Sequence, residues 1–209
     1  MEPMNQFFSQ IKTLRDLCLI LQEVKKDILP VLQKDLETAE FLKGAIIDYK
    51  LSLYFFLKWI KVNFKPQNIL YPASGFDRIP KIVFGKNNVI HTSIEDLQDG
   101  GKKYFNQLGD GIKIVADNHN LPFESEIFDL VLLLDSTFEA IGECRDEIIR
   151  VATKGGIIIL TRNIFQEDNV KDRISHYQQS KLLKILHPSL ENYKKKKSNV
   201  EFFVFQKFH

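Results

Sequence analysis

Five short aliphatic runs recur between residues 68 and 161 and constrain the fold more than any other feature of the chain. The runs are Asn68–Tyr71, Val89–Thr92, Ile112–Ala116, Phe128–Leu134 and Ile157–Thr161. Runs this short and this apolar are typical of strands that are buried on both faces, as in parallel sheets. We therefore expect five neighbouring strands in one mainly parallel sheet.

Helical patterns separate these runs. Crossover helices are predicted over Leu97–Leu108 and Phe138–Thr153, and the Lys-Gly-Gly turn at 154–156 is predicted to end the second of them just before a strand. This alternation predicts an open, Rossmann-like α/β sheet flanked by helices. A further helix is expected over about 170–186, and Val200–Phe205 is expected to be the last strand, at an edge of the sheet.

The beginning of the chain has a different pattern, and we predict an N-terminal helical cap over residues 1–65 and a Rossmann-like domain over residues 66–209. Apolar residues recur at helical spacing through the cap, and its last helix is predicted over Ala45–Val62, before Pro66. Four aromatic residues thicken this helix, namely Tyr49, Tyr54, Phe55 and Trp59. They fit either an aromatic wall for a substrate or packing against the body of the protein, which is the usual role of aromatic side chains.

Composition and charge exclude several classes of protein. Of 209 residues, 44% are hydrophobic, 27% are charged and 17 are phenylalanine, which is too apolar and too aromatic for a disordered chain. No strict glycine period and no run of roughly 18 apolar residues occurs, which excludes collagen and a membrane span. The 29 Lys and Arg residues nearly balance the 27 Asp and Glu residues, so only local basic patches can bind nucleic acid.

The two cysteines indicate a reducing compartment. Cys18 and Cys144 lie far apart, without a CxxC motif or a histidine at metal-ligand spacing, so no metal site is expected. No secretory signal is expected, because Lys12 and Arg15 precede any long apolar run. We therefore expect a cytoplasmic protein without a membrane partner.

The candidate binding site is formed by the residues that follow the predicted strands. Ligands of open α/β sheets bind beyond the carboxyl ends of the strands, near the switch in strand order. Here these ends are mostly polar and small or acidic, and they comprise Tyr71–Asp77, Ser93–Asp96, Asp117–Phe123 and Asp135–Thr137.

The second half of this pattern resembles the class I S-adenosylmethionine-dependent methyltransferases. The resemblance rests on IKIVADNHNLPFESEIFDLVLLLDST at 112–137 and ECRDEIIRVATKGGIIIL at 143–160. In that family the third strand ends in an Asp before a Leu-Pro-Phe-like turn, a Phe-Asp opens the fourth strand, and a Gly-Gly turn leads into the fifth. The resemblance covers residues 66–165 and is specific over 112–160. It implies the methyltransferase fold and S-adenosylmethionine as the cofactor.

The resemblance also implies where that cofactor lies. The candidate cofactor-binding residues are Tyr71, Pro72, Ala73, Ser74, Gly75, Asp77, Ser93, Asp117, Asn118, Asp135 and Ser136. Where the family has three glycines in its first loop, this chain has Ala73, Gly75 and Asp77, and Tyr71 stands in the place of an acid. Ala73 is small enough to be tolerated there if its φ is negative, and Asp77 is a candidate to replace the acid by pairing with the ligand's ammonium group.

Two positions have an equally simple structural interpretation. Asp117 and the N–H of Asn118 can together recognise the exocyclic amine and a ring nitrogen of adenine, or Asp117 can hold an Asx turn. Ser93 stands where the family has an acid for the ribose hydroxyls, with Glu95 or Asp96 a turn later as substitutes. Ser93 can instead cap the helix that follows.

No catalytic residue is assigned, because methyl transfer from an activated sulfonium depends mainly on in-line placement of the nucleophile. The titratable side chains nearest the predicted mouth are His91, His119 and Asp135, and for the histidines we expect a structural or solvent-facing role. No Asn-Pro-Pro-Tyr motif occurs, so methylation of nucleic-acid bases or of glutamine gains no support. Lys194–Lys197 can contact RNA phosphates or form a solvated loop beside an edge strand.

Three functional hypotheses follow. The first is a methyltransferase that uses S-adenosylmethionine to methylate an unidentified small-molecule or macromolecular acceptor. The second is a degenerate, non-catalytic relative that binds or scaffolds a partner, which the missing glycines favour. The third, a nicotinamide-dependent oxidoreductase, is disfavoured because no GxGxxG motif follows the first strand.

Overall fold

The computed structural model describes residues 43–74, 77–94, 108–134, 144–163, 183–185 and 200–208, together with a few single residues. The described helices are α4 (Lys43–Phe64), α5 (Ile79–Phe84) and α8 (Arg145–Val151). The described strands are β1 (Ile69–Tyr71), β2 (Val89–Ser93), β3 (Ile112–Val115), β4 (Phe128–Leu133), β5 (Ala152–Asn163), β6 (Leu183–Ile185) and β7 (Val200–Lys207). The helices expected before residue 43 lie outside the described residues, as does nearly all of the helix expected over 97–108.

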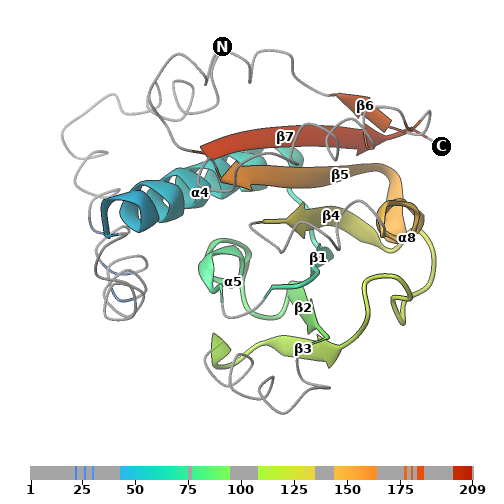
Figure 1. Ribbon diagram of the computed structural model, residues 1–209, viewed down its shortest axis with the longest axis horizontal. Coiled ribbons are helices and arrows are strands. Elements are labelled where there is room, and N and C mark those ends of the chain that lie inside the picture. Colours follow the sequence, from blue (N-terminus) through green and yellow to red (C-terminus); the bar gives the residue numbers. More distant parts are fainter. Residues whose placement is uncertain are drawn as a thin grey trace.

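The described strands form one seven-stranded sheet in the order β3-β2-β1-β4-β5-β7-β6 (Figure 1). Strands β1 to β5 pair in parallel, which confirms the five predicted strands and the mainly parallel sheet. The last strand, β7, runs antiparallel to β5 and β6 and lies between them. The prediction that the last strand is an edge strand was therefore wrong, because β6 pairs with its outer side. The helix expected over 170–186 is also wrong at Leu183–Ile185, which form β6.

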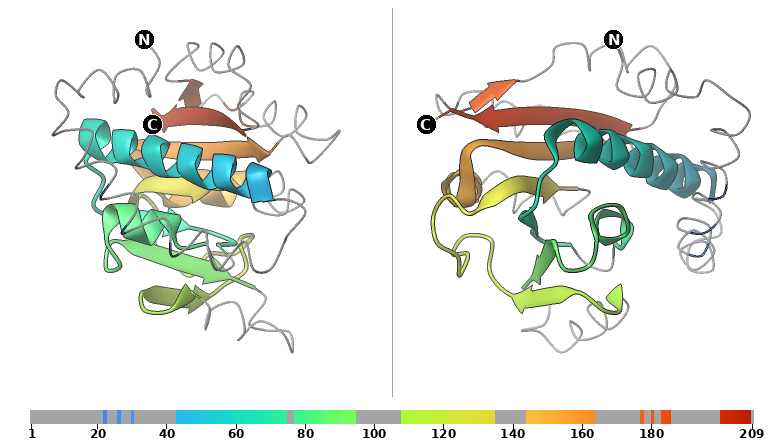
Figure 2. Two further views of the ribbon diagram at one scale, coloured as in Figure 1. Left: turned by 90° about the vertical axis from the view of Figure 1, so that its left-hand side faces the viewer. Right: turned by 180° about the vertical axis from the view of Figure 1, so that it is seen from behind.

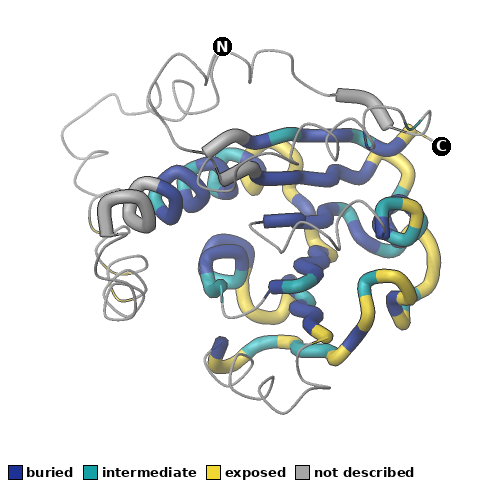
Figure 3. Tube along the Cα trace, in the orientation of Figure 1, coloured by how far each residue is buried: buried dark blue, intermediate teal, exposed yellow. Residues whose placement is uncertain are grey.

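Helices cover both faces of the sheet. Figure 2 shows α4 and α5 in front of the sheet in its left panel, and α8 lies on the opposite face. One apolar cluster joins α4 and α5 to the sheet, and a second joins α8 to the other face. Strand β1 is buried throughout and β2 and β4 are buried at all but one position each, whereas β3 carries exposed positions (Figure 3). Ile112 and Val115 are 38% and 41% exposed, so burial on both faces, as expected for this strand, was wrong.

Helix α4 packs into the same apolar cluster as the sheet. Leu53, Phe56, Leu57 and Ile60 are fully buried, and the ring of Phe56 stacks on Phe202 of β7 with centroids 4.1 Å apart. The aromatic residues of this helix therefore pack against the body of the protein: Tyr49 and Tyr54 are buried, while Phe55 and Trp59 pack at the margin of the cluster.

Helix α4 ends at Phe64, close to the predicted boundary. The next residue, Lys65, has a φ of 49°, the left-handed conformation that commonly ends a helix. Pro66 follows and cannot continue the helical hydrogen bonding.

The turn between α8 and β5 differs from its prediction by a few residues. Helix α8 ends at Val151, so Thr153 lies in β5 and not in the helix. A Cβ on Gly156 would lie 2.8 Å from the carbonyl oxygen of Thr153 and 3.1 Å from that of Phe128, so this position requires glycine. The Lys-Gly-Gly turn is thus an irregularity within the first residues of β5, where its register with β4 shifts.

Candidate functional site

The carboxyl ends of β1, β2, β3 and β4 lie at one edge of the sheet, because these strands are parallel. The structure describes most of the predicted cofactor-binding residues at this edge, namely Tyr71, Pro72, Ala73, Ser74, Asp77, Ser93, Asp117 and Asn118. Gly75, Asp135 and Ser136 lie outside the described residues, as do Glu95 and Asp96.

The loop after β1 passes through a left-handed residue. Ala73 has a φ of 48°, so the negative φ on which its fit was conditional is not found. This conformation costs an L-residue about 1–2 kcal/mol, and glycine adopts it freely. The loop is tied to β2, since the N–H of Ser74 donates to the carbonyl of Thr92 at 3.0 Å. At position 73 the backbone therefore has a conformation typical of glycine, although the residue is alanine.

Asp77, further along this loop, points inward and makes three contacts. Its Oδ1 lies 2.9 Å from Nζ of Lys50 on α4 and accepts the N–H of Ile79 at 3.1 Å. Its Oδ2 accepts the hydroxyl of Tyr71 at 3.3 Å. The carboxylate thus holds the start of α5 and also forms an ion pair whose two side chains are each only 11% exposed.

Sequence reasoning missed Lys50, although the sequence contains a signal for it. Lys50 precedes Leu53 and Leu57 by three and seven residues, so it lies on the apolar stripe of α4. A lysine on such a stripe needs a partner when the helix packs. Its partner is 27 residues away in a loop, and the helical pattern alone gives no such pairing.

The end of β2 places three polar residues in the interior. His91 is fully buried, and neither ring nitrogen has a hydrogen-bond partner among the described residues. Burial lowers the pKa of His91 to about 4, against a smaller raising effect of Asp77, so the ring is neutral at pH 7. Thr92 and Ser93 are also buried, and the carbonyl of Ser93 accepts the N–H of Ala116 at 3.2 Å. His91 is therefore a core residue and not a side chain of the mouth.

The loop after β3 contains the Asx turn that was one of the two roles considered for Asp117. Oδ1 of Asp117 accepts the N–H of His119 at 2.9 Å and lies 2.8 Å from Nδ1 of the same residue. These hydrogen bonds, the backbone one first, lower the pKa of Asp117. Both side chains are about half exposed. The turn presents Asp117 and Asn118 at the carboxyl edge, and recognition of adenine there stays a prediction.

Helix α8 fixes the rest of this loop through two residues that sequence reasoning missed. Oε1 of Glu147 accepts the N–H of Leu121 at 2.8 Å, and Arg150 donates to the carbonyls of Phe123 at 2.8 Å and Leu121 at 3.2 Å. Arg150 also pairs with Glu147 at 2.7 Å, and this hydrogen bond is the main reason why the pKa of Glu147 is lowered. Their spacing of three residues on one helix was the available signal.

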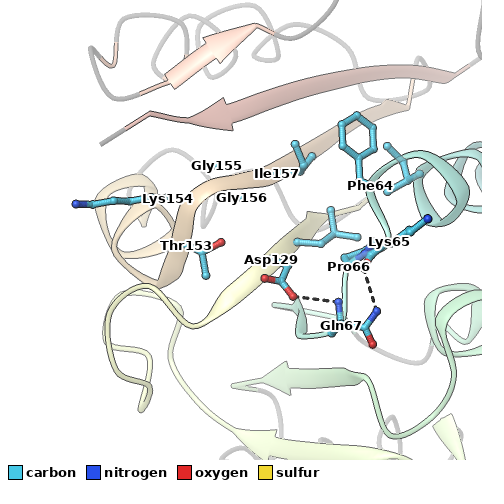
Figure 4. Close-up of a pocket in the computed structure, with 12 residues that line it drawn as sticks. Phe64, Lys65, Pro66, Gln67, Asp129, Thr153, Lys154, Gly155, Gly156 and Ile157 are labelled. Atoms are coloured by element: carbon cyan, nitrogen blue, oxygen red, sulfur yellow. Dashed lines mark hydrogen bonds between the residues drawn. The ribbon is translucent and has the colours of Figure 1, made fainter.

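A cavity of about 380 Å³ lies at the opposite, amino edge of the sheet (Figure 4). Its lining includes Phe64, Gln67, Thr153, Gly156 and Asp129, whose Oδ2 accepts the backbone N–H groups of Gln67 and Asn68 at 3.0 Å each. This carboxylate therefore joins the start of β1 to β4. Because ligands of such sheets bind at the carboxyl ends, the cavity is separate from the candidate site.

Two kinds of feature are absent from the described part of the chain. Within it, no group of three His, Cys, Asp or Glu side chains is placed to hold a metal ion. No helix among the described residues has the length and apolarity needed to cross a membrane.

Comparison by sequence finds no matching family model and no matching curated protein. Comparison by structure finds many chains that share the fold. A chain from the complex between the Haloferax volcanii Trm112 methyltransferase activator and a methyltransferase has a TM-score of 0.58 at 11% identity, covering 84% of this chain and 97% of that one.

Two other solved structures are similar. The N-methyltransferase NodS from Bradyrhizobium japonicum has a TM-score of 0.52 at 10% identity, covering 76% of this chain and 94% of its own. The [4+2]-cyclase SpnF has a TM-score of 0.53 at 12% identity, covering 75% and 81%. The chain therefore has the class I methyltransferase fold, as its sequence predicts. Because SpnF is a cyclase, the reaction has to be argued from the site.

Proposed function

We propose that this chain binds S-adenosylmethionine at the carboxyl ends of β1, β2 and β3 and transfers its methyl group to a small-molecule or macromolecular acceptor. The observation that carries the proposal is the carboxylate of Asp77, only 11% exposed beside the end of β1. Its Oδ2 accepts the hydroxyl of Tyr71 at 3.3 Å, so the carboxylate lies beside the residue that stands in the place of the family's acid. This arrangement supports Asp77 as the replacement for the acid that Tyr71 displaces.

The described residues fit the groups of this cofactor. A nearly buried carboxylate is a suitable partner for the ammonium group of the amino-acid end. Oγ of Ser74 and Oδ1 of Asn118 are buried and have no hydrogen-bond partner among the described residues, so both retain capacity for a ligand. Bound S-adenosylmethionine supplies the activated methyl group. The work of the chain is then to bind and orient the reactants, which needs no general base for a reactive acceptor.

The proposal is tested by titrating the purified full chain with S-adenosylhomocysteine in a calorimeter. Saturable one-to-one binding, with none for NADH, is the expected result. Asp77→Asn is expected to lose about 1.5–3 kcal/mol of binding free energy, because it removes a charge-assisted contact with the ammonium group.

Asp110→Asn is the matched control. Asp110 is an exposed carboxylate paired with Lys86 at 2.7 Å, so its change should leave the affinity as it is. Equal affinity of the Asp77→Asn variant and the parent would show that Asp77 serves only the loop and α5.

The second hypothesis, a non-catalytic relative that binds or scaffolds a partner, is supported by a specific observation. Lys50 already neutralises the charge of Asp77, and residues 73 and 77 are not glycine. This hypothesis requires that neither S-adenosylmethionine nor S-adenosylhomocysteine binds, so the same titration decides between the two. Both interpretations of Lys194–Lys197, an RNA contact and a solvated loop, fall outside the described residues, and the cytoplasmic location stays a prediction.

A further inference from the structure

The ion pair between Lys50 and Asp77 joins two parts of the chain at the carboxyl edge of the sheet. Lys50 comes from the third turn of α4, and Asp77 from the loop after β1. Nζ and Oδ1 are 2.9 Å apart. The hydroxyl of Tyr71 contacts Oδ2 of Asp77 at 3.3 Å and the carbonyl of Leu134 at 3.5 Å. The pair therefore lies where β1 and β4 end, beside the proposed cofactor.

Burying this ion pair has a cost in free energy, which points to a functional reason for keeping it. Removing two charges from water has a large cost in free energy, and their mutual attraction commonly does no more than offset it. An apolar residue at position 50 would extend the stripe of Leu53 and Leu57 without this cost. Each of the two charged side chains is 11% exposed, so the pair is only partly removed from solvent.

An acid already paired with a lysine is a weak site for a lone cation. The pair as a whole, however, presents one negative and one positive group side by side. The amino-acid end of S-adenosylmethionine carries an ammonium and a carboxylate on one carbon atom, which is the complementary arrangement. Two opposed ion pairs keep all four charges partnered in a partly desolvated place.

We propose that Lys50 binds the carboxylate of the cofactor's amino-acid end while Asp77 binds its ammonium group, so that the pair recognises the zwitterion. This inference rests on the proposed function and extends it to a residue of α4. Ser74, whose buried Oγ has no partner among the described residues, is the neighbouring group that can complete the contact.

The parent protein tests the inference with two ligands that differ only in the carboxylate. S-Adenosylmethionine and decarboxylated S-adenosylmethionine are titrated in a calorimeter, with 5′-methylthioadenosine as the ligand that lacks the whole amino-acid end. The expected result is a loss of about 10-fold or more in affinity when the carboxylate is removed.

The variant Lys50→Met then assigns this preference to one residue. It is expected to bind S-adenosylmethionine about 10-fold more weakly while binding 5′-methylthioadenosine as the parent does. Lys58→Met is the matched control, because Lys58 lies on the same helix, about two turns after Lys50, with Nζ 5.4 Å from the centre of the Tyr54 ring. Circular dichroism and thermal unfolding confirm that each variant is folded.

The outcomes separate this inference from the proposed function. Equal affinity of the parent for the two matched ligands overturns the role of Lys50 and leaves the proposed function standing. Tighter binding of S-adenosylmethionine by Lys50→Met also overturns it, since Lys50 would then compete with the ligand for Asp77. Absence of binding for all three ligands overturns the proposed function itself, and this inference with it.

Discussion

At the scale of single residues, His91 shows how burial changes the chemistry of a side chain. It lies in β2, close to the carboxyl edge of the sheet, yet it packs in the core. Its ring centroid is 5.5 Å from that of Tyr71. Its lowered pKa of about 4 has a consequence for stability. The unfolded chain takes up a proton near pH 6.5 and the folded chain does not until about pH 4.

We therefore expect the free energy of unfolding to fall as the pH drops from 7 to 5, with His91 contributing about 2 kcal/mol of the loss. The sign follows because the unfolded state binds more protons in this range. Urea unfolding at the two pH values measures the change. His91→Leu should remove this contribution, whereas His119→Gln, at a half-exposed position, should retain it. An unchanged pH dependence in His91→Leu would contradict the prediction.

Ala73 makes the second prediction at this scale. Ala73→Gly relieves about 1–2 kcal/mol of left-handed strain in the folded state. It also raises the conformational entropy of the unfolded chain, which lowers stability by about 0.4–1 kcal/mol. The expected net effect is a small stabilisation. Ala73→Val should instead destabilise by more than about 1 kcal/mol, because a β-branched residue is strongly disfavoured at positive φ. Thermal unfolding of the two variants checks the opposite signs, and similar effects of both would contradict a left-handed residue 73.

At the scale of helices and strands, apolar runs predicted the central strands because those strands are buried on both faces. The same rule explains the error over β7. Apolar and polar residues do not alternate in its run Val200–Phe205, because apolar side chains point to both faces. Phe202 and Val204 pack toward α4, while Phe205 packs on the other face. This is the pattern of an interior strand, and β7 does lie between β5 and β6. Strands as short as β6 have no periodicity to recognise.

Helix α8 gives the prediction at this scale, because it holds the loop after β3 in place. Arg150→Met removes the donors to the carbonyls of Leu121 and Phe123 and is expected to cost about 1–2 kcal/mol of stability. The N–H of Leu121, which is bound to Glu147, should exchange with solvent faster. Urea unfolding and amide hydrogen exchange provide the two measurements.

Asp146→Asn on the same helix is the control for this prediction. Asp146 is 83% exposed and pairs with Arg145 at 2.8 Å, so the loss of its charge should cost less than about 0.5 kcal/mol. Equal costs for Arg150→Met and Asp146→Asn would mean that α8 does not fix the loop.

At the scale of the whole molecule, the sequence predicted which edge of the sheet carries the candidate residues better than it predicted their contacts. The carboxyl edge follows from the order of strands and helices, and the residues after β1, β2 and β3 meet there. The pairing of Lys50 with Asp77 depends on how α4 packs across the sheet, which no local pattern contains. The left-handed φ of Ala73 likewise depends on the loop's hydrogen bond to β2.

The predicted cap over residues 1–65 leads to a prediction for the whole chain. We propose that the cap covers the ligand mouth, and α4 within it already supplies fully buried residues to the common core. Deleting residues 1–40 should therefore leave a folded protein that retains S-adenosylhomocysteine binding in part but exposes more apolar surface and uses its acceptor less well.

Deleting residues 1–64 removes Leu53, Phe56, Leu57 and Ile60 and should abolish cooperative folding, because each such loss costs about 2–5 kcal/mol. Calorimetric binding, dye binding to apolar surface and thermal unfolding distinguish the two truncations. A 1–40 deletion with unchanged solubility and unchanged activity would show that these residues are an independent appendage, and cooperative unfolding of the 1–64 deletion would show the same of α4.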